Sequence, residues 1–323
     1  MSVAGRRGPL APVPAPSVLV RAPGKVNLSL RVGRVQDDGY HPIVTVFQAV
    51  GLFEEVRVTV AEPGAGISLA VRGPHADVVP TGEENLAWRA AALLAERTGI
   101  AADVRIEIAK GVPVGGGMAG GSADAAATLL ACETLWSAGV AREDLLELAG
   151  ELGSDVPFGL LGHTAVGTGR GHLLTPAMTR GELHWAFAVR DEGLSTAGVY
   201  AAFDARAGGR DDVSPDDDAG LLAALRAGDA EAVGRALHND LEEASLDLAP
   251  HLAETVALAE RAGAAGVVVS GSGPTVAALG RNRQHALALA DAWAAAGVAD
   301  SVHHAAGPVH GARVVTQVSR ARD

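Results

Sequence analysis

Alternating apolar and polar positions predict a group of strands in the first third of the chain. Most of them repeat with a period of two, which is typical of strands that bury one face. Pro23 and Gly24 are expected to separate the first two strands, and "DDGYHP" at 37–42 predicts a turn. The predicted strands cover residues 18–22, 26–33, 43–50, 54–60, 67–71 and 103–110.

Helical patterns and further strands alternate irregularly through the rest of the chain. This irregularity predicts an α+β protein of two domains rather than a doubly wound parallel sheet, with a boundary near 165–180. The charged segment 208–218 predicts a mobile loop. Predicted helices cover residues 84–99, 122–136, 142–153, 219–228, 231–245, 251–263 and 284–297, and predicted strands cover 183–189 and the two arms of 266–280.

The composition excludes several classes of function. The chain has 323 residues, a net charge of −12 and a pI near 5.3, which argues against a nucleic-acid-binding or a polybasic membrane-binding surface. No apolar run reaches the roughly 18–20 residues that a spanning helix needs. The start of the chain also lacks the apolar stretch of a secretory signal, so we expect a cytoplasmic protein.

Two rare residue types narrow the candidate chemistry. Cys132 is the single cysteine, so the chain can form neither an internal disulfide nor a cysteine-based zinc cluster. Its apolar helical surroundings predict a buried packing residue. Of 26 basic residues only Lys25 and Lys110 are lysines, which makes each of them a candidate for a specific role.

The segment "PVGGGMAGGSADAA" at 113–126 predicts a binding site made of backbone. It matches G-x-G-x-x-G, but no acidic residue follows a second strand as a dinucleotide site requires, since Asp144 falls inside a helical pattern. No G-K-[ST] follows either. Glycines before a helix start expose N–H groups and a partial positive charge, which favours a phosphate cradle. The alternative is a flexible connection with Ser122 as an ordinary N-cap.

Two charged residues stand at breaks in the pattern. Lys25 follows a Pro-Gly step in "APGKVNL", and Asp155 follows a helix end in "LGSDVPF". Taken singly, a surface lysine and a helix cap are the simpler readings. An ionised carboxylate beside a lysine can instead orient a hydroxyl group and accept its proton.

Three segments in this order resemble the signature motifs of the GHMP kinases: "APGKVNL", "PVGGGMAGGSADAA" and "VVVSGSGPT". The resemblance spans roughly residues 18–315. The segments "DDGYH", "GSDVPF" and "HNDLE" narrow it to the branch that phosphorylates 4-diphosphocytidyl-2-C-methyl-D-erythritol with ATP in the non-mevalonate isoprenoid pathway. The resemblance therefore implies a small-molecule kinase and a substrate with a cytidine diphosphate moiety.

The resemblance also implies a domain organisation. Each of two domains is expected to be a mostly antiparallel sheet packed with helices, with the active site in the cleft between them. An N-terminal ATP-binding domain is expected at 17–172 and a C-terminal substrate-side domain at 173–315. Residues 1–16 and 316–323 are expected to be tails. A monomer or a weak homodimer is expected.

The resemblance assigns roles to individual positions. Lys25 and Asp155 fall on the family's catalytic pair, and Ser270, Gly271, Ser272 and Gly273 fall on a third motif that borders the site. Magnesium is expected to bridge the phosphates; Ser122 is a candidate protein ligand, and coordination by water without a protein ligand is the alternative. The expected ATP loop consists of Pro113, Val114, Gly115, Gly116, Gly117, Met118, Ala119, Gly120, Gly121, Ser122 and Ala123. The expected substrate-binding residues are Asn27, Tyr40, His41, Thr196 and Tyr200.

The chain departs from the family pattern in its glycine loop. Ala119 and Ala123 stand where a glycine and a second serine are commoner, so Ala119 is expected to keep a negative φ and the cradle to lose a hydroxyl. Weaker contacts are expected there, but not lost function. Met118 is expected to pack under the adenine.

Rival readings remain at this point. One alternative is a mevalonate or homoserine kinase. The two tyrosines of the chain, Tyr40 and Tyr200, argue against it, because those substrates have no base to stack on them. A ligand-sensing homologue that lost catalysis is another. Retention of both Lys25 and Asp155 argues against it.

Overall fold

Two long paired strands, β1 (Ser17–Val32) and β2 (Ile43–Val60), run through both halves of the molecule in the computed structural model, which describes residues 15–206 and 208–319. The predicted break at Pro23–Gly24 is wrong, because β1 continues there as a bulge in its antiparallel pairing with β2. Proline is tolerated because β12 pairs with β1 only as far as Arg21. The two strands predicted at 43–50 and 54–60 are likewise one strand.

The first sheet has eight strands and is mostly antiparallel. Its main path runs β12-β1-β2-β4-β3, while β5 and β6 extend it beside β2, and β8 pairs with β1. Only the β3–β4 and β1–β8 pairs are parallel among the pairs of this sheet in the described chain. The remaining strands are β3 (Ile67–Arg72), β4 (Val104–Ala109), β5 (Thr164–Thr168), β6 (Leu173–Pro176), β8 (His238–Asn239) and β12 (Arg313–Val318).

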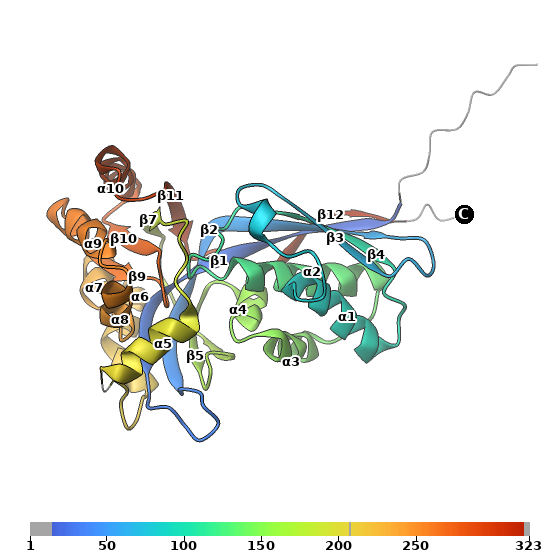
Figure 1. Cartoon of the computed structure of the whole chain (residues 1–323), viewed down its shortest axis with the longest axis horizontal. Coiled ribbons are helices and arrows are strands. Elements are labelled where there is room, and N and C mark those ends of the chain that lie inside the picture. Colours follow the sequence, from blue (N-terminus) through green and yellow to red (C-terminus); the bar gives the residue numbers. More distant parts are fainter. Residues whose placement is uncertain (1–14, 207, 320–323) are drawn as a thin grey trace, which may run out of the picture.

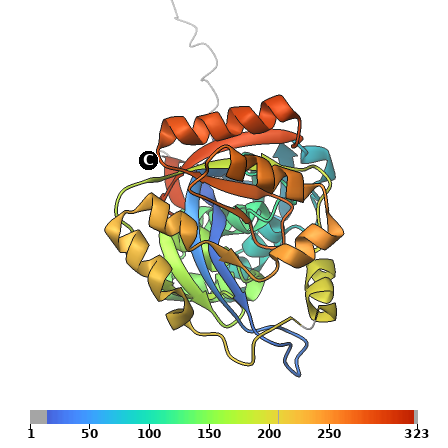
Figure 2. The same cartoon turned by 90° about the vertical axis from the view of Figure 1, so that its left-hand side faces the viewer.

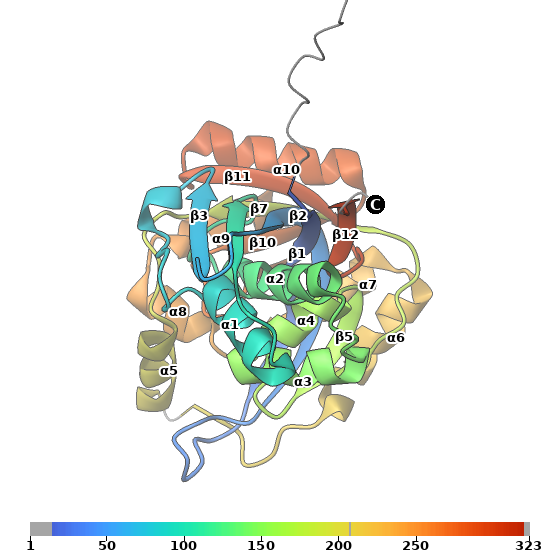
Figure 3. The same ribbon diagram turned by 90° about the vertical axis from the view of Figure 1, so that its right-hand side faces the viewer.

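Four helices cover one face of this sheet, as Figures 1 and 3 show. Alanine-rich α2 lies closest to the strands, and its small side chains allow it to pack against both β1 and β2. α1 ends on Gly99 as the sequence predicts, in the left-handed conformation that favours glycine. The helices are α1 (Leu86–Thr98), α2 (Gly120–Trp136), α3 (Arg142–Leu152) and α4 (Val156–Leu161), and η1 (Ala76–Val78) is a short 3-10 turn.

The second sheet has four antiparallel strands in the order β11-β7-β10-β9. Helices α9 and α10 cover one face with Leu252 and Trp293, and Figure 2 shows α10 lying across this end of the molecule. Its elements are β7 (Leu183–Val189), β9 (Gly266–Val269), β10 (Val276–Gly280), β11 (Ser301–Gly307), α5 (Thr196–Ala205), α6 (Ala219–Ala227), α7 (Ala230–Arg235), α8 (Glu242–Leu248), α9 (Leu252–Arg261), α10 (Arg283–Ala296) and the 3-10 turn η2 (Pro215–Asp218).

The other face of the second sheet packs onto the ends of β1 and β2. Trp185 and Phe187 of β7 share a core with Val26 of β1 and Val46 of β2. The same two strands contribute their opposite ends to the core beneath α1 and α2. The two halves therefore share their longest strands.

One helix prediction in the second half is wrong, and one predicted loop ends in a short helical turn. The helix predicted at 231–245 is divided into α7, the short strand β8 and α8, because Asn239 pairs in the first sheet beside β1. The segment predicted as a mobile loop at 208–218 ends in η2. Its last residue, Asp218, is buried and accepts hydrogen bonds from Ser29 Oγ at 2.8 Å and Arg31 Nε at 2.9 Å.

The expected domain boundaries need adjustment at the C-terminal end. Residues 316–318 were expected to be a tail but belong to β12, which pairs with β1 in the first sheet. β6 also belongs to that sheet, although it follows residue 172. Of the two expected tails, residues 1–14 and 320–323 lie outside the described residues. No helix within the described ranges is long and apolar enough to cross a membrane.

Candidate active site

A cavity of about 970 Å³ lies where the two halves meet. All three signature segments contribute to its lining, together with Ser154 and Asp155 just before α4, residues of α5 and the turn between β5 and β6. Most of the expected site residues line it. They are Lys25, Asn27, Tyr40, His41, Pro113, Gly115, Gly116, Gly117, Ala119, Gly120, Gly121, Ser122, Asp155, Thr196, Tyr200, Gly271, Ser272 and Gly273.

Lys25 lies on β1 between two bulges, and the strand's period of two puts Asn27 on the same face. Lys25 Nζ donates to Asn27 Oδ1 at 2.6 Å, and Asn27 Nδ2 donates to Thr45 Oγ1 at 2.8 Å. Burial lowers the pKa of Lys25, and the charge of Asp155 acts in the opposite direction. The ammonium group is thus held in place and largely desolvated, which strengthens its attraction for an anion.

Asp155 lies directly before α4, with Pro157 in the first turn of that helix. Its carboxylate does not cap the helix, so the simple capping role is wrong. Instead Oδ2 lies 3.9 Å from Lys25 Nζ, and about a third of the side chain is exposed to the cavity. The carboxylate is therefore free to contact a ligand.

The glycine run leads into α2 two residues earlier than predicted. The helix begins at Gly120, so Ser122 lies in its first turn and is not the N-cap. Ala119 is the N-cap residue and has a φ of 60°, so the expectation of a negative φ is wrong. No side chain caps this end of the helix. Its first N–H groups therefore face the loop, as an anion-binding helix start requires.

The glycine loop touches the third motif across the cavity. Gly117 has a φ of 72°, and an added Cβ would lie 2.3 Å from the carbonyl oxygen of Ser270, so only glycine fits. Ser270 Oγ in turn donates to the carbonyl oxygen of Gly117 at 3.3 Å. Asn239 Nδ2 supports the third motif by donating to the carbonyls of Val269 and Gly271, each at 2.8 Å.

Four of the expected site residues do not line the main cavity. Ser270 and Ala123 are buried, and the Met118 side chain is fully buried in the core beside Val26 and Val112. The expectation that Met118 packs under an adenine is therefore wrong, because its side chain points away from the loop's open side. Val114 lines a second pocket of about 300 Å³, which shares Gly115, Gly120 and Gly121 with the first.

Lys110, the second lysine, lies buried behind the helix start of α2. Its Nζ lies 2.6 Å from Asp124 Oδ2 and 2.7 Å from Glu54 Oε1. Burial raises the pKa of Glu54 to about 8, Asp124 adds to this rise and Lys110 opposes it. The pKa of Asp124 is also raised by burial. One cation thus balances two carboxyl groups directly beneath Gly120.

A cluster of rings lies at the other end of the lining. The rings of His41 and Tyr200 have centroids 5.1 Å apart, and Tyr40 is half exposed beside them in the same cavity. His41 Nδ1 lies 2.7 Å from the carbonyl oxygen of Gly33, which can only accept, so Nδ1 carries a hydrogen. Burial raises the pKa of Tyr200 to about 12, and the charge of Asp155 adds to the rise. Its phenol is therefore neutral at ordinary pH.

Sequence reasoning missed two charged residues of this end of the cavity. Asp204 of α5 lies 3.4 Å from His41 Nε2, and Arg170 lies in the turn between β5 and β6. A Gly-Arg-Gly turn at 169–171 was a usable signal for the arginine, since it predicts an exposed tip. Asp204 was missed because no helix is predicted over 196–205, and only that helix places it one turn after Tyr200.

The residues present fit a magnesium ion held mainly by phosphates. No group of three or more His, Cys, Asp or Glu side chains gathers as a metal site within residues 15–206 and 208–319. Ser122 and Asp155 nevertheless line the cavity together, which gives one hydroxyl and one carboxylate near the glycine loop. Magnesium sites commonly use one or two protein ligands, with phosphates and water supplying the rest.

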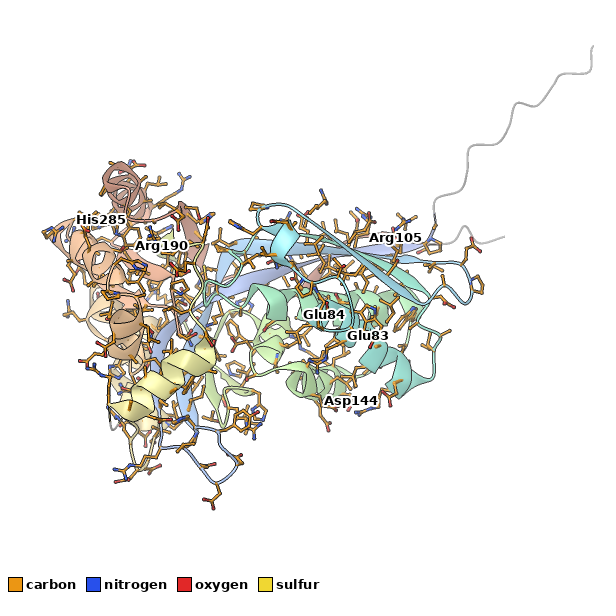
Figure 4. All side chains as sticks on the ribbon, in the orientation of Figure 1. Glu83, Glu84, Arg105, Asp144, Arg190 and His285 are labelled. Atoms are coloured by element: carbon orange, nitrogen blue, oxygen red, sulfur yellow. The ribbon has the colours of Figure 1, made fainter. Side chains whose placement is uncertain are left out.

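The glycine loop is not part of a dinucleotide-binding fold, because the sheet topology differs. The sheet that carries the glycine loop is mostly antiparallel, whereas a dinucleotide fold needs a parallel one. Asp144, the acidic residue nearest the required spacing, is exposed on α3, and Figure 4 shows it at the outer edge of the molecule.

Two family models match the chain. The model described as GHMP kinases N terminal domain matches residues 85–163, and the model described as GHMP kinases C terminal matches residues 221–299. Curated relatives match over most of the chain. A 4-diphosphocytidyl-2-C-methyl-D-erythritol kinase of Leifsonia xyli subsp. xyli is 49% identical over 308 residues, which cover 93% of this chain and 99% of the relative.

A protein of the same name from Thermobifida fusca is 52% identical over 305 residues, covering 93% of this chain and 98% of the relative. Among solved structures, a 4-(cytidine 5'-diphospho)-2C-methyl-D-erythritol kinase superposes with a TM-score of 0.70 at 34% identity and covers 90% of this chain and 98% of its own. A homoserine kinase from Cytophaga hutchinsonii shares the fold, with a TM-score of 0.73 at 20% identity over 93% of this chain and 97% of its own.

Proposed function

The chain belongs to the GHMP kinases and, within them, to the 4-diphosphocytidyl-2-C-methyl-D-erythritol kinases, and we propose on that basis how its cavity works. It is an ATP-dependent small-molecule kinase. The reaction is transfer of the γ-phosphoryl group of ATP to the 2-hydroxyl group of 4-diphosphocytidyl-2-C-methyl-D-erythritol, which gives the 2-phosphate and ADP. This step belongs to the non-mevalonate isoprenoid pathway.

One observation carries the proposal. A single cavity joins the glycine loop, the Lys25–Asp155 pair and the rings of His41 and Tyr200. The three groups suit the three parts of the reaction, namely the phosphates of ATP, the hydroxyl that is phosphorylated and a flat base. A kinase for a small alcohol without a base would have no use for the rings.

The glycine loop is proposed to hold the phosphates of ATP. Backbone N–H groups at the uncapped start of α2 point to the loop, and the helix dipole adds partial positive charge there. Phosphoryl transfer passes through a loose transition state, so positioning and neutralisation of charge supply most of the acceleration. A preorganised backbone cradle supplies both without a change of protonation.

Lys25 and Asp155 are proposed to act on the hydroxyl group and the transferred phosphoryl group. Asn27 fixes the Lys25 ammonium group, which is placed to neutralise charge on the reacting oxygens. Asp155 Oδ2 lies 3.9 Å from the same ammonium group and faces the cavity, so the carboxylate can orient the substrate hydroxyl and accept its proton. The proton leaves the hydroxyl for Asp155 Oδ2 as the new O–P bond forms.

We propose that a magnesium ion bound here would supply positive charge that neutralises the phosphates. Ser122 and Asp155 would hold it from the protein side, since they provide the oxygen donors of the lining next to the glycine loop.

The ring cluster is proposed to bind the cytosine. Tyr40 and Tyr200 provide aromatic faces for a planar base. His41 Nδ1 is engaged with the carbonyl oxygen of Gly33, so Nε2, which lies 3.4 Å from Asp204 Oδ2, is the ring nitrogen on the side of the base.

The decisive experiment is a coupled ADP-release assay with ATP, magnesium and 4-diphosphocytidyl-2-C-methyl-D-erythritol. Mevalonate and homoserine are assayed in parallel as the substrates of rival GHMP kinases. Turnover of the cytidine compound alone supports the proposal, and turnover of either rival instead overturns it. Binding of the cytidine compound without any turnover would identify a ligand-sensing homologue.

We further propose that the protein acts in the cytoplasm, where ATP is available, as a monomer or a weak homodimer. Sedimentation velocity over a hundredfold range of concentration checks the second point. A tight tetramer or larger assembly would contradict it.

A further inference from the structure

Arg170 occupies the tip of the turn that joins β5 and β6. It is flanked by Gly169 and Gly171, which have φ angles of 69° and 96°, so the turn is tight on both sides of the arginine. The carbonyl oxygen of Gly169 accepts from the N–H of Ile43 at 2.8 Å, which fixes the turn to the start of β2. The arginine side chain therefore starts from a fixed backbone and lines the main cavity.

The guanidinium group of Arg170 is stacked on Tyr40. Its Cζ lies 3.5 Å from the centroid of the ring, well within the range of a cation–π contact. Arg170 Nη2 also donates to Asp38 Oδ2 at 3.0 Å, while Asp38 Oδ1 accepts from the backbone N–H of Tyr40 at 2.9 Å. The guanidinium group therefore holds the segment that carries Tyr40 in two ways: it stacks on the Tyr40 ring and it pairs with the Asp38 carboxylate.

The position of Arg170 is unusual for a surface arginine. About half of its side chain is exposed, yet it faces a cavity whose other Lys or Arg side chain, within the described lining, is Lys25. Lys25 is committed to Asn27 and Asp155 at the glycine-loop end. Arg170 provides the positive charge at the opposite end of the cavity, where Tyr40, His41 and Tyr200 lie.

We infer that Arg170 is a specificity-determining residue that holds Tyr40 for stacking on the substrate's base and adds positive charge beside the substrate's diphosphate. The guanidinium group covers one face of the Tyr40 ring and leaves the other for the base. Guanidinium also presents five N–H donors in a plane, which suits phosphate oxygens better than an ammonium group does. The inference rests on the proposed function, because it assumes a cytidine diphosphate ligand.

The test measures Arg170→Gln and Arg170→Lys in the coupled assay and measures binding of CDP by calorimetry. Arg170→Gln is expected to raise KM for the cytidine substrate and Kd for CDP roughly tenfold, the loss of a partly desolvated cation–π contact. The kcat value and the KM for ATP are expected to stay within about twofold of the wild-type values. The reason is that the lost contact stabilises the bound substrate and the transition state equally. Arg170→Lys is expected to recover only part of the affinity, because it keeps the charge without the plane.

A double-mutant cycle separates this role from general support of the turn. In a Tyr40→Ala background, Arg170→Gln is expected to cost less CDP affinity than in the wild type, because the stacking partner is already missing. Arg97→Gln is the matched control. Arg97 is half exposed and paired with Glu151 on the surface at 2.8 Å, so its replacement is expected to change neither KM.

The outcomes distinguish the inference from the proposed function. Unchanged KM and CDP affinity in Arg170→Gln would overturn the inference while leaving the function intact. A parallel rise in KM for ATP would assign Arg170 a structural role. Fully additive effects in the cycle would show that Arg170 does not act through Tyr40. Either result would overturn the inference as stated. Absence of CDP binding and of turnover in the wild-type protein would overturn both.

Discussion

Asp155 Oδ2 lies 3.9 Å from Lys25 Nζ, and this pair joins an element at the start of the chain to one that follows the third helix. The lysine is buried and fixed by Asn27, whereas the carboxylate remains partly exposed to the cavity. This asymmetry suits a fixed cation and a carboxylate that meets the substrate.

Asp155→Asn is expected to lower kcat by a factor of about 10²–10⁴, the usual contribution of a general base. KM for ATP is expected to change little, because the glycine loop is untouched. Steady-state kinetics and nucleotide binding by calorimetry check this. Asp144→Asn, an exposed carboxylate on α3, serves as the control and should behave as wild type. A rate for Asp155→Asn near that of the control would remove Asp155 from the mechanism.

Ala119→Gly is expected to stabilise the protein. Ala119 has a φ of 60°, which costs a residue with a Cβ about 1–2 kcal/mol, partly offset by the entropy that glycine loses on folding. A net gain of about 0.5–1 kcal/mol in the free energy of unfolding is expected, with activity retained. Ala127→Gly, the same change inside α2, is expected to destabilise by about 1 kcal/mol instead. Urea titration of both variants checks the contrast, and a loss of stability in both would contradict it.

The conformation of Ala119 illustrates what the sequence cannot reveal. The glycine loop, the helix after it and the alternating strands follow local patterns, so they were predictable from neighbouring residues. The backbone angle at Ala119 is imposed by tertiary contacts that hold the loop between Lys25 and the third motif. No local signal distinguishes it from an alanine in a regular helix.

Long-range pairing explains the other differences. β12 and the short strand at Asn239 form because β1 offers them an edge, which local periodicity does not encode. The expected pair Lys25 and Asp155 came from the resemblance to a family, and the fold brings them to one cavity. Arg170 was missed because the turn that carries it lies outside every motif. Asp204 was missed because no helix is predicted over 196–205, where it lies one turn after Tyr200 on the same face.

Tyr200→Ala is expected to raise KM for the cytidine substrate by roughly tenfold or more, since stacking of a base on an aromatic ring contributes about 1–3 kcal/mol. Tyr200→Phe keeps the ring and should stay close to wild type. Because burial raises the pKa of Tyr200 to about 12, the phenol does not ionise in the assay range. The pH profiles of Tyr200→Phe and wild type from pH 6 to 10 should therefore coincide, and a new alkaline limb in one of them would contradict this.

Glu54 is expected to make the free energy of unfolding fall as pH rises. Its pKa is raised by burial from 4.5 to about 8 in the folded protein, so the folded state binds more protons than the unfolded state between these values. The stabilisation is complete below about pH 4.5 and is lost as pH rises through about 8. Since one pKa unit corresponds to about 1.4 kcal/mol, the loss is on the order of a few kcal/mol.

Glu54→Gln is expected to flatten this dependence, because Lys110 then faces Asp124 alone. Chemical denaturation at several values from pH 5 to 9 measures the slope. Glu55→Gln is the matched control, since Glu55 is partly exposed on the same strand and pairs with Arg21. Equal slopes for Glu54→Gln and wild type would show that the buried cluster does not titrate in this range.

The shared strands β1 and β2 have a mechanical consequence. One end of each is built into the core beneath α1 and α2, and the other end into the core beneath the second sheet. If one half unfolds, the ends of β1 and β2 that belong to the core of the other half lose their support. Heating should therefore produce one cooperative unfolding transition rather than two. A fragment that keeps only one half would expose the Val, Leu and Phe side chains of the strand ends that the other half buries. Such a fragment is expected to aggregate rather than fold independently.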